Sequence, residues 1–201
     1  MAKRKNENSA RSSPSSDARA RAADPSSPRG GTKTEGAVKG GNGRYHFRMA
    51  GLKKVAAGTG YSTAHGGVVE GERMLVGYIH KPRGTGSRLH THNNEQFNYV
   101  LQGTLVGSVN GKRVVAPAGT LIYIPANAPH TLVATPEEDV IFLAIKDLSQ
   151  GIIGRAVDGT MAGPRYLPGH APRGGRAAQR EGAKSKRRTK HKEWRSDAAI
   201  R

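Results

Sequence analysis

The sequence predicts an all-β domain, a sandwich or a barrel, between two basic tails. Short apolar runs separated by Gly, Pro and Asn turns fill the middle of the 201-residue chain, and no convincing helical period interrupts them. Charge is the second observation, because most of the net charge of +18 lies at the two ends. The chain has no cysteine, which excludes disulfides and thiolate metal sites and fits a reducing compartment.

The distribution of charge sets the domain boundaries. Residues 1–48 carry 11 Lys or Arg and 4 Asp or Glu, residues 49–170 carry 11 and 8, and residues 171–201 carry 11 and 3. The middle segment is nearly balanced and long enough for one hydrophobic core. The two ends contain little to bury, so we predict disordered basic tails at residues 1–48 and 171–201.

Two interpretations of the tails stay open. Either they make weak nonspecific contact with nucleic acid, as polycationic arms do, or they are solvated and carry no function. No helix-turn-helix or zinc-finger pattern and no series of stacking aromatic residues supports a dedicated nucleic-acid module. The first 48 residues have a further alternative, because Met49 would also serve as a translation start.

Hydrophobic segments in this chain are all short. There is no run of about 18 apolar residues, so we expect no membrane span. The basic N-terminus lacks the apolar region of a secretory signal. We therefore expect a cytoplasmic protein without a membrane partner.

The middle segment is predicted to form consecutive strands, at residues 73–80, 96–101, 104–109, 112–116, 121–124, 130–134 and 140–146. Asn110-Gly111 is a strong signal for a type I′ hairpin turn. Residues 52–61 are expected to form an edge strand or a loop, and residues 148–169 to wrap the domain surface. Aromatic side chains are expected to fill the core, among them Tyr78, Phe97, Tyr99, Tyr123 and Phe142.

Three histidines lie close to these segments, two before residues 96–101 and one at the start of residues 130–134. His90 and His92 are two residues apart, so a strand would present both imidazoles on one face. Gln96 or Glu95 follows after a short turn, and His130 opens a later strand. Three histidines with one Gln or Glu are a suitable ligand set for a divalent metal ion.

Two patterns around these residues resemble the motifs of the cupin superfamily. They are Gly84-x5-His90-x-His92-x3-Gln96-x6-Gly103 and Gly119-x5-Pro125-x-Asn127-x2-His130. The resemblance covers residues 70–147 and implies a small single-domain cupin, a double-stranded β-helix or jelly-roll barrel. It also implies a homodimer and a metal ion inside the barrel, held by His90, His92, Gln96 and His130.

The third ligand position departs from the family pattern. Cupins usually carry Glu where the spacing to Gly103 selects Gln96, and Glu95 stands one position away. Because a shift of one residue turns a strand side chain to the opposite face, Gln96 is the first candidate and Glu95 the alternative. With a neutral amide the ion keeps its full charge and is a stronger Lewis acid. These ligands leave the metal open among Fe, Mn, Zn and Ni.

Three classes of function follow. The resemblance favours a small metal-dependent enzyme of isomerase, lyase or dioxygenase type that acts on a small carboxylated or carbonyl substrate. A non-catalytic cupin sensor or small-molecule binding module is the alternative, and a nucleic-acid-associated protein ranks last. Arg83 and Arg88 lie beside the predicted metal-binding segment that begins at His90. They either bind a substrate carboxylate or are solvated. No side chain can be named as a catalytic acid or base from the sequence.

Overall fold

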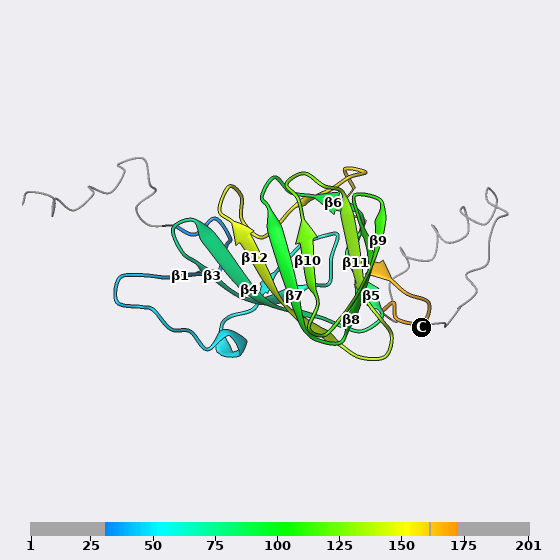
Figure 1. The fold of residues 1–201 in the computed structure, drawn as a ribbon, viewed down its shortest axis with the longest axis horizontal. Helices are drawn as coiled ribbons and strands as arrows, with labels where there is room; N and C mark the ends of the chain where they lie inside the picture. The colour runs from blue at the N-terminus through cyan, green and yellow to red at the C-terminus, as the bar shows by residue number, and fades with distance from the viewer. Residues whose placement is uncertain (1–30, 161, 173–201) are drawn as a thin grey trace, which may run out of the picture. The chain divides into compact units, whose positions relative to one another are not determined.

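Nearly all regular structure in the chain is β-strand (Figure 1). The computed structural model describes residues 31–160 and 162–172. In chain order the elements are β1 (Val38–Lys39), the 3₁₀ helix η2 (Met49–Gly51), β2 (Val55–Ala56), β3 (His65–Glu70), β4 (Met74–Lys81), β5 (Thr85–Gly86), β6 (His90–Thr91), β7 (Gln96–Gln102), β8 (Thr104–Val109), β9 (Lys112–Pro117), β10 (Leu121–Ile124), β11 (His130–Ala134), β12 (Val140–Asp147), β13 (Arg155–Ala156) and β14 (Arg165–Tyr166).

The strands of the described residues belong to two sheets. One has the order β1-β3-β4-β12-β7-β10, with β2 also paired to β3, and the other has the order β13-β6-β11-β5-β14, with β8 on β11 and β9 on β8. Pairing is antiparallel except between β1 and β3. The predicted all-β jelly-roll class is confirmed, and the chain crosses repeatedly between strands that are remote in sequence.

Each strand predicted from the sequence is present within a residue or two. The β8–β9 hairpin turns at Asn110 and Gly111, whose φ angles of 48° and 76° are both positive, as a type I′ turn requires. Strand β3 and the two-residue strands β1, β5, β6, β13 and β14 are not among the predicted ranges. In β3 two glycines replace the apolar side chains that would have given a period-2 pattern.

The segment before residue 48 corrects one prediction. Disorder was expected as far as residue 48, whereas β1 pairs with β3 and Thr34 is buried. The buried carboxylate of Glu70 accepts hydrogen bonds from the backbone N–H groups of Lys33 and Thr34, both at 2.7 Å. These contacts join residues 36 or 37 positions apart, so local composition does not reveal them. The remaining parts of the predicted tails, residues 1–30 and 173–201, lie outside the described residues.

The core lies between the inner faces of the strands, where aliphatic side chains from both sheets are buried, including Leu75, Ile79, Val100, Leu105, Ile124, Leu132 and Val140. The prediction that aromatic residues fill it is wrong for Tyr99 and Tyr123, which are 39% and 49% exposed. Phe142 is buried as predicted. Side chains alternate along a strand, and in β7 the inner face belongs to Gln96 and its even-numbered neighbours.

No helix in the part of the chain that the structure describes is long and apolar enough to cross a membrane.

Replacement of Gly107 is predicted to destabilise the fold. Gly107 in β8 faces Leu132 in β11, and a Cβ at this position would overlap the backbone carbonyl of Thr131. We expect Gly107→Ala to lower the free energy of unfolding by about 1–3 kcal/mol, because the paired strands must separate to admit the methyl group. Urea denaturation followed by circular dichroism measures this loss. Gly51→Ala is the matched control, since a Cβ there meets nothing within 4 Å. Equal stability of the Gly107 variant and the parent would contradict the prediction.

Candidate functional site

Three histidines meet where β6 pairs with β11. His90 opens β6, His92 follows it in the chain, and His130 opens β11. Antiparallel pairing sets His90 directly opposite His130. Ring centroids are 4.0 Å apart for His90 and His130, 4.8 Å for His92 and His130, and 6.2 Å for His90 and His92. The structure therefore brings together the three histidines that the sequence singled out.

Backbone carbonyls orient all three rings. The Nδ1 atom lies 2.8 Å from Arg88 O in His90, 2.7 Å from Asn94 O in His92 and 2.9 Å from Ala128 O in His130. A carbonyl oxygen only accepts, so Nδ1 carries the hydrogen in each ring and Nε2 keeps its lone pair. The Nε2 atom of His92 is buried and has no hydrogen-bond partner among the described residues. Ligating histidines in proteins are usually held in this way.

Burial keeps these imidazoles neutral. It lowers the pKa of His90 to about 2, helped by the charge of His130. Burial also lowers the pKa of His92 to about 4, with a further contribution from the charge of Lys146. Burial lowers the pKa of His130 to about 3. At neutral pH the three Nε2 atoms are therefore free bases, which is the form that binds metal ions.

Gln96 faces inward and Glu95 faces outward. Gln96 is 7% exposed, and its Nε2 donates a hydrogen bond of 2.6 Å to Oδ1 of Asn98, which leaves the amide oxygen for another partner. Glu95 is exposed, and its Oε1 accepts a hydrogen bond of 2.8 Å from the hydroxyl of Tyr123. The orientation of β7 thus supports Gln96 over Glu95 as the fourth candidate ligand.

Asn94 supports the site and was not foreseen. Besides accepting the His92 hydrogen bond, this fully buried residue donates from Nδ2 to the backbone oxygens of Asp147, Gln150 and Gly151 at 3.1, 3.2 and 3.3 Å. It joins the segment that carries His90 and His92 to the chain after β12. The acceptors lie more than 50 positions away, so the sequence gives no local signal for this role.

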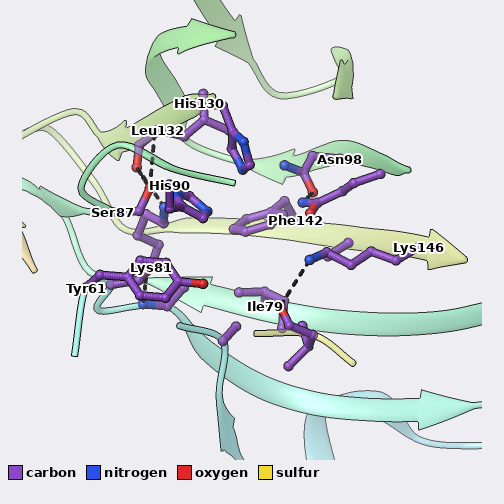
Figure 2. A pocket seen from close by; sticks show the side chains of 16 residues that line it. Tyr61, Ile79, Lys81, Ser87, His90, Asn98, His130, Leu132, Phe142 and Lys146 are labelled. Carbon is purple, nitrogen blue, oxygen red and sulfur yellow. Dashed lines mark hydrogen bonds between the residues drawn. The ribbon is translucent and has the colours of Figure 1, made fainter. Parts of the chain in front are cut away.

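A cavity of about 50 Å³ opens beside the histidines. That volume is several times what one water molecule needs, so it suits a small ligand. Figure 2 shows side chains converging on it from both sheets. The lining residues are Ala57, Tyr61, Ser62, Ala64, Ile79, Lys81, Ser87, His90, Gln96, Asn98, His130, Leu132, Phe142, Ala144, Lys146 and Ile152. His92 instead lines a neighbouring polar cavity together with Asn127 and Arg155.

Two lysines in the cavity were also missed by the sequence reasoning. Lys81 and Lys146 are each 3% exposed, and burial lowers the pKa of both to about 7. Their positions follow from strand alternation, because Lys81 continues the inner face of Leu75 and Ile79 in β4. Lys146 likewise continues the inner face of β12. A lysine in phase with buried apolar residues is the signal that would have revealed them.

Arg83 and Arg88, which precede His90 in the chain, do not line the cavity. Arg88 donates to Asp158 and Thr160 at 3.4 and 3.2 Å. The backbone N–H of Arg83 donates to the carboxylate of Asp139 at 2.9 Å. Neither residue is placed to clamp a substrate carboxylate within this cavity.

The candidate ligands have donor atoms that suit a metal ion, but their arrangement in the structure does not yet form a metal site. In residues 31–160 and 162–172, no group of three or more His, Cys, Asp or Glu side chains could hold a metal ion as placed. The donors themselves are suitable, since they comprise three neutral imidazoles and an amide oxygen. Binding would require the rings to turn toward a common point.

Comparison with solved structures finds similar chains in several bacteria. The polyketide cyclase RemF from Streptomyces resistomycificus is 19% identical, with 51% of this chain and 78% of that chain covered and a TM-score of 0.46. KdgF from Halomonas sp. is 21% identical, with 42% and 77% covered and a TM-score of 0.39. The EutQ protein of Clostridium difficile is 27% identical, with 37% and 52% covered and a TM-score of 0.33.

A family model matches part of the sequence in the folded region. No curated protein matches the chain. Residues 77–146 match the family model described as a cupin domain, and this range contains both predicted motifs and the candidate ligands. Residues 77–146 are therefore similar to a cupin domain.

Proposed function

We propose that this chain is a metal-binding cupin enzyme of isomerase, lyase or dioxygenase type that acts on a small carboxylated or carbonyl substrate. The observation that carries the proposal is the shared orientation of three buried, neutral imidazoles beside a small cavity. His90, His92 and His130 would bind a divalent ion (Fe, Mn, Zn or Ni) through Nε2. Gln96 would bind it through its amide oxygen. When bound, the ion would polarise a carbonyl or carboxylate oxygen of the substrate.

The residues around the ligands prepare the site for such a substrate. Asn98 fixes the Gln96 amide by accepting its hydrogen bond. The ring of Tyr61 lies 4.6 Å from that of His90 and limits its movement. Apolar lining residues such as Phe142 and Leu132 exclude water, which strengthens electrostatic interactions between the polar groups and a ligand.

The alternative is a non-catalytic sensor or binding module. One observation favours it, because no Asp or Glu of the described residues lines the cavity, so no carboxylate is present there as a proton acceptor. Conversion of a bound ligand into a different compound would indicate an enzyme. Recovery of the ligand unchanged would indicate a binding module. Contact of the tails with nucleic acid, and a cytoplasmic location, remain predictions.

Metal content provides the direct test of the site. We expect purified protein to contain about one equivalent of a divalent metal, and His92→Ala and Gln96→Ala to lower the affinity by a factor of about 10 or more, because each removes a donor atom. Elemental mass spectrometry after dialysis measures this and identifies the metal. Glu95→Ala is the matched control and should keep its metal, since Glu95 is exposed. Absence of metal even after reconstitution would refute the proposal, and loss only in the Glu95 variant would show that the ligand was misassigned.

Acid sensitivity tests the neutral state of the histidines. The pKa of His130 is lowered to about 3 by burial, whereas an unfolded chain has a histidine pKa of about 6.5. Below pH 6.5 the unfolded state therefore binds a proton that the folded state does not, and the free energy of unfolding falls as the pH falls. We expect the fall between pH 7 and pH 5 to be smaller by about 2 kcal/mol in metal-free His130→Asn than in the metal-free parent.

Urea denaturation at each pH measures this difference. The matched control is His46→Asn, because His46 is exposed and should leave the pH dependence unchanged. An identical fall in the His130 variant and the parent would show that burial does not lower the pKa of this imidazole.

A homodimer is part of the proposal, as the family resemblance implies. The edge strand β10 exposes Leu121 and Tyr123, which are 56% and 49% exposed, and would supply apolar area to a second copy. We expect light scattering at micromolar concentration to give twice the chain mass for the parent and the single chain mass for Leu121→Glu. A monomeric parent would remove the dimer from the proposal.

A further inference from the structure

The cavity contains two lysines that the proposed metal ligands do not use. Lys81 ends β4 and Lys146 lies near the end of β12, and both are 3% exposed. Each Nζ has a single backbone acceptor, Leu132 O at 2.7 Å for Lys81 and Ile152 O at 3.0 Å for Lys146. A carbonyl satisfies one N–H group but leaves the charge of an ammonium uncompensated.

No carboxylate in the described part of the chain neutralises these lysines inside the cavity. The lining contains no Asp or Glu, and the ion pairs recorded for the described residues join His80 to Asp139 and Arg88 to Asp158. Asp147 follows Lys146 directly and its charge favours the ammonium form, but burial outweighs this effect and lowers the pKa of Lys146. The Asp147 carboxylate lies outside the cavity, on the opposite face of β12, where it accepts hydrogen bonds from the backbone of Glu95 and Ser149. An anion from outside the chain would supply the missing charge.

The spacing of the two lysines indicates a ligand with two anionic groups. Strands β4 and β12 are paired, and Lys81 stands opposite Val140, which is six residues before Lys146. Six residues correspond to about 20 Å of strand between the two backbone positions, and the long lysine stems shorten the gap between the ammonium groups inside the cavity that both line. Figure 2 shows Lys81 and Lys146 on opposite sides of it. Each Nζ contacts a different backbone oxygen, Leu132 O or Ile152 O, so the two lysines offer separate positions for two anionic groups.

We propose that the cavity binds a short-chain dicarboxylate, with one carboxylate group directed to Lys81 and the other to Lys146. The small volume limits the chain between the two groups, and Phe142, whose ring lies 5.9 Å from Lys81 Nζ, offers an apolar contact for that chain. The inference rests on the proposed function in placing the ligand at the same cavity, and it narrows the substrate class to dianions. Charge-assisted hydrogen bonds from both lysines supply the selectivity.

Calorimetric titration compares three sets of ligands. The dicarboxylates malonate, succinate, glutarate and adipate are tested beside monocarboxylates of the same chain length and the neutral diamides. We expect at least one dicarboxylate to bind on the order of 10-fold tighter than its monocarboxylate counterpart, and the diamides not to bind. Titrations use both the protein as purified and protein freed of metal by a chelator, because a dicarboxylate could also coordinate a metal ion.

Lysine variants assign the preference to its residues. We expect Lys81→Met and Lys146→Met each to abolish the dicarboxylate preference, while circular dichroism and urea denaturation show a fold at least as stable as the parent, because a buried charge has been removed. Lys112→Met is the matched control, since Lys112 is exposed on β9 and should leave binding unchanged. If a variant fails to fold, the ligand comparison on the parent chain still decides.

Several outcomes would overturn the inference. They are the absence of any dicarboxylate preference in the parent, a preference that survives in both lysine variants, and a preference that exists only in metal-loaded protein. Dicarboxylate binding in a protein that takes up no metal would instead refute the metal-dependent enzyme and leave this inference standing. Metal binding without a dicarboxylate preference would refute this inference and leave the proposed metal site standing.

Discussion

The antiparallel pairing of β6 with β11 holds the candidate site together. It sets His90 opposite His130, although 40 positions of chain separate them, and β11 is itself fixed by its longer pairing with β8. Close approach of these backbones depends on Gly107, where a side chain would collide with β11. Once the two strands are paired, backbone carbonyls engage the Nδ1 atoms of all three imidazoles. The main chain thus sets which nitrogen of each histidine remains available as a donor atom.

The cavity is polar at a cost in stability. Three imidazoles and two ammonium groups are buried, and burial lowers the pKa of each by disfavouring its charged form. A core of apolar residues of the same volume would be more stable, since buried charges without partners are expensive. Four of these groups, His90, His130, Lys81 and Lys146, line one small cavity, which is more typical of a binding site than of a structural core. Metal ions and anions are the ligands that would use both kinds of group.

Much of this arrangement could be predicted from the sequence. Strand positions followed from apolar runs and turn residues, and the Asn110-Gly111 turn has the predicted type I′ geometry. The spacing to Gly103 selected Gln96 over Glu95, and the structure turns Gln96 inward. In the same strand Tyr99 is three positions from Gln96 and therefore faces outward. The expectation that Tyr99 lies in the core was inconsistent with the inward orientation predicted for Gln96. Lys81 and Lys146 were overlooked because lysine is rarely buried, although both continue an inner face.

The sequence by itself determined the all-β class, the turns, the cupin motifs and the inward face of β7, because these depend on local period and on residue types at fixed spacing. Only the tertiary structure decided which remote groups share a space. Examples are the buried carboxylate of Glu70, which accepts hydrogen bonds from backbone N–H groups near residue 34, and Asn94, which joins the segment after His92 to the chain after β12. The physical reason is that a buried polar group must find a partner wherever the fold supplies one, and that partner has no fixed distance along the chain.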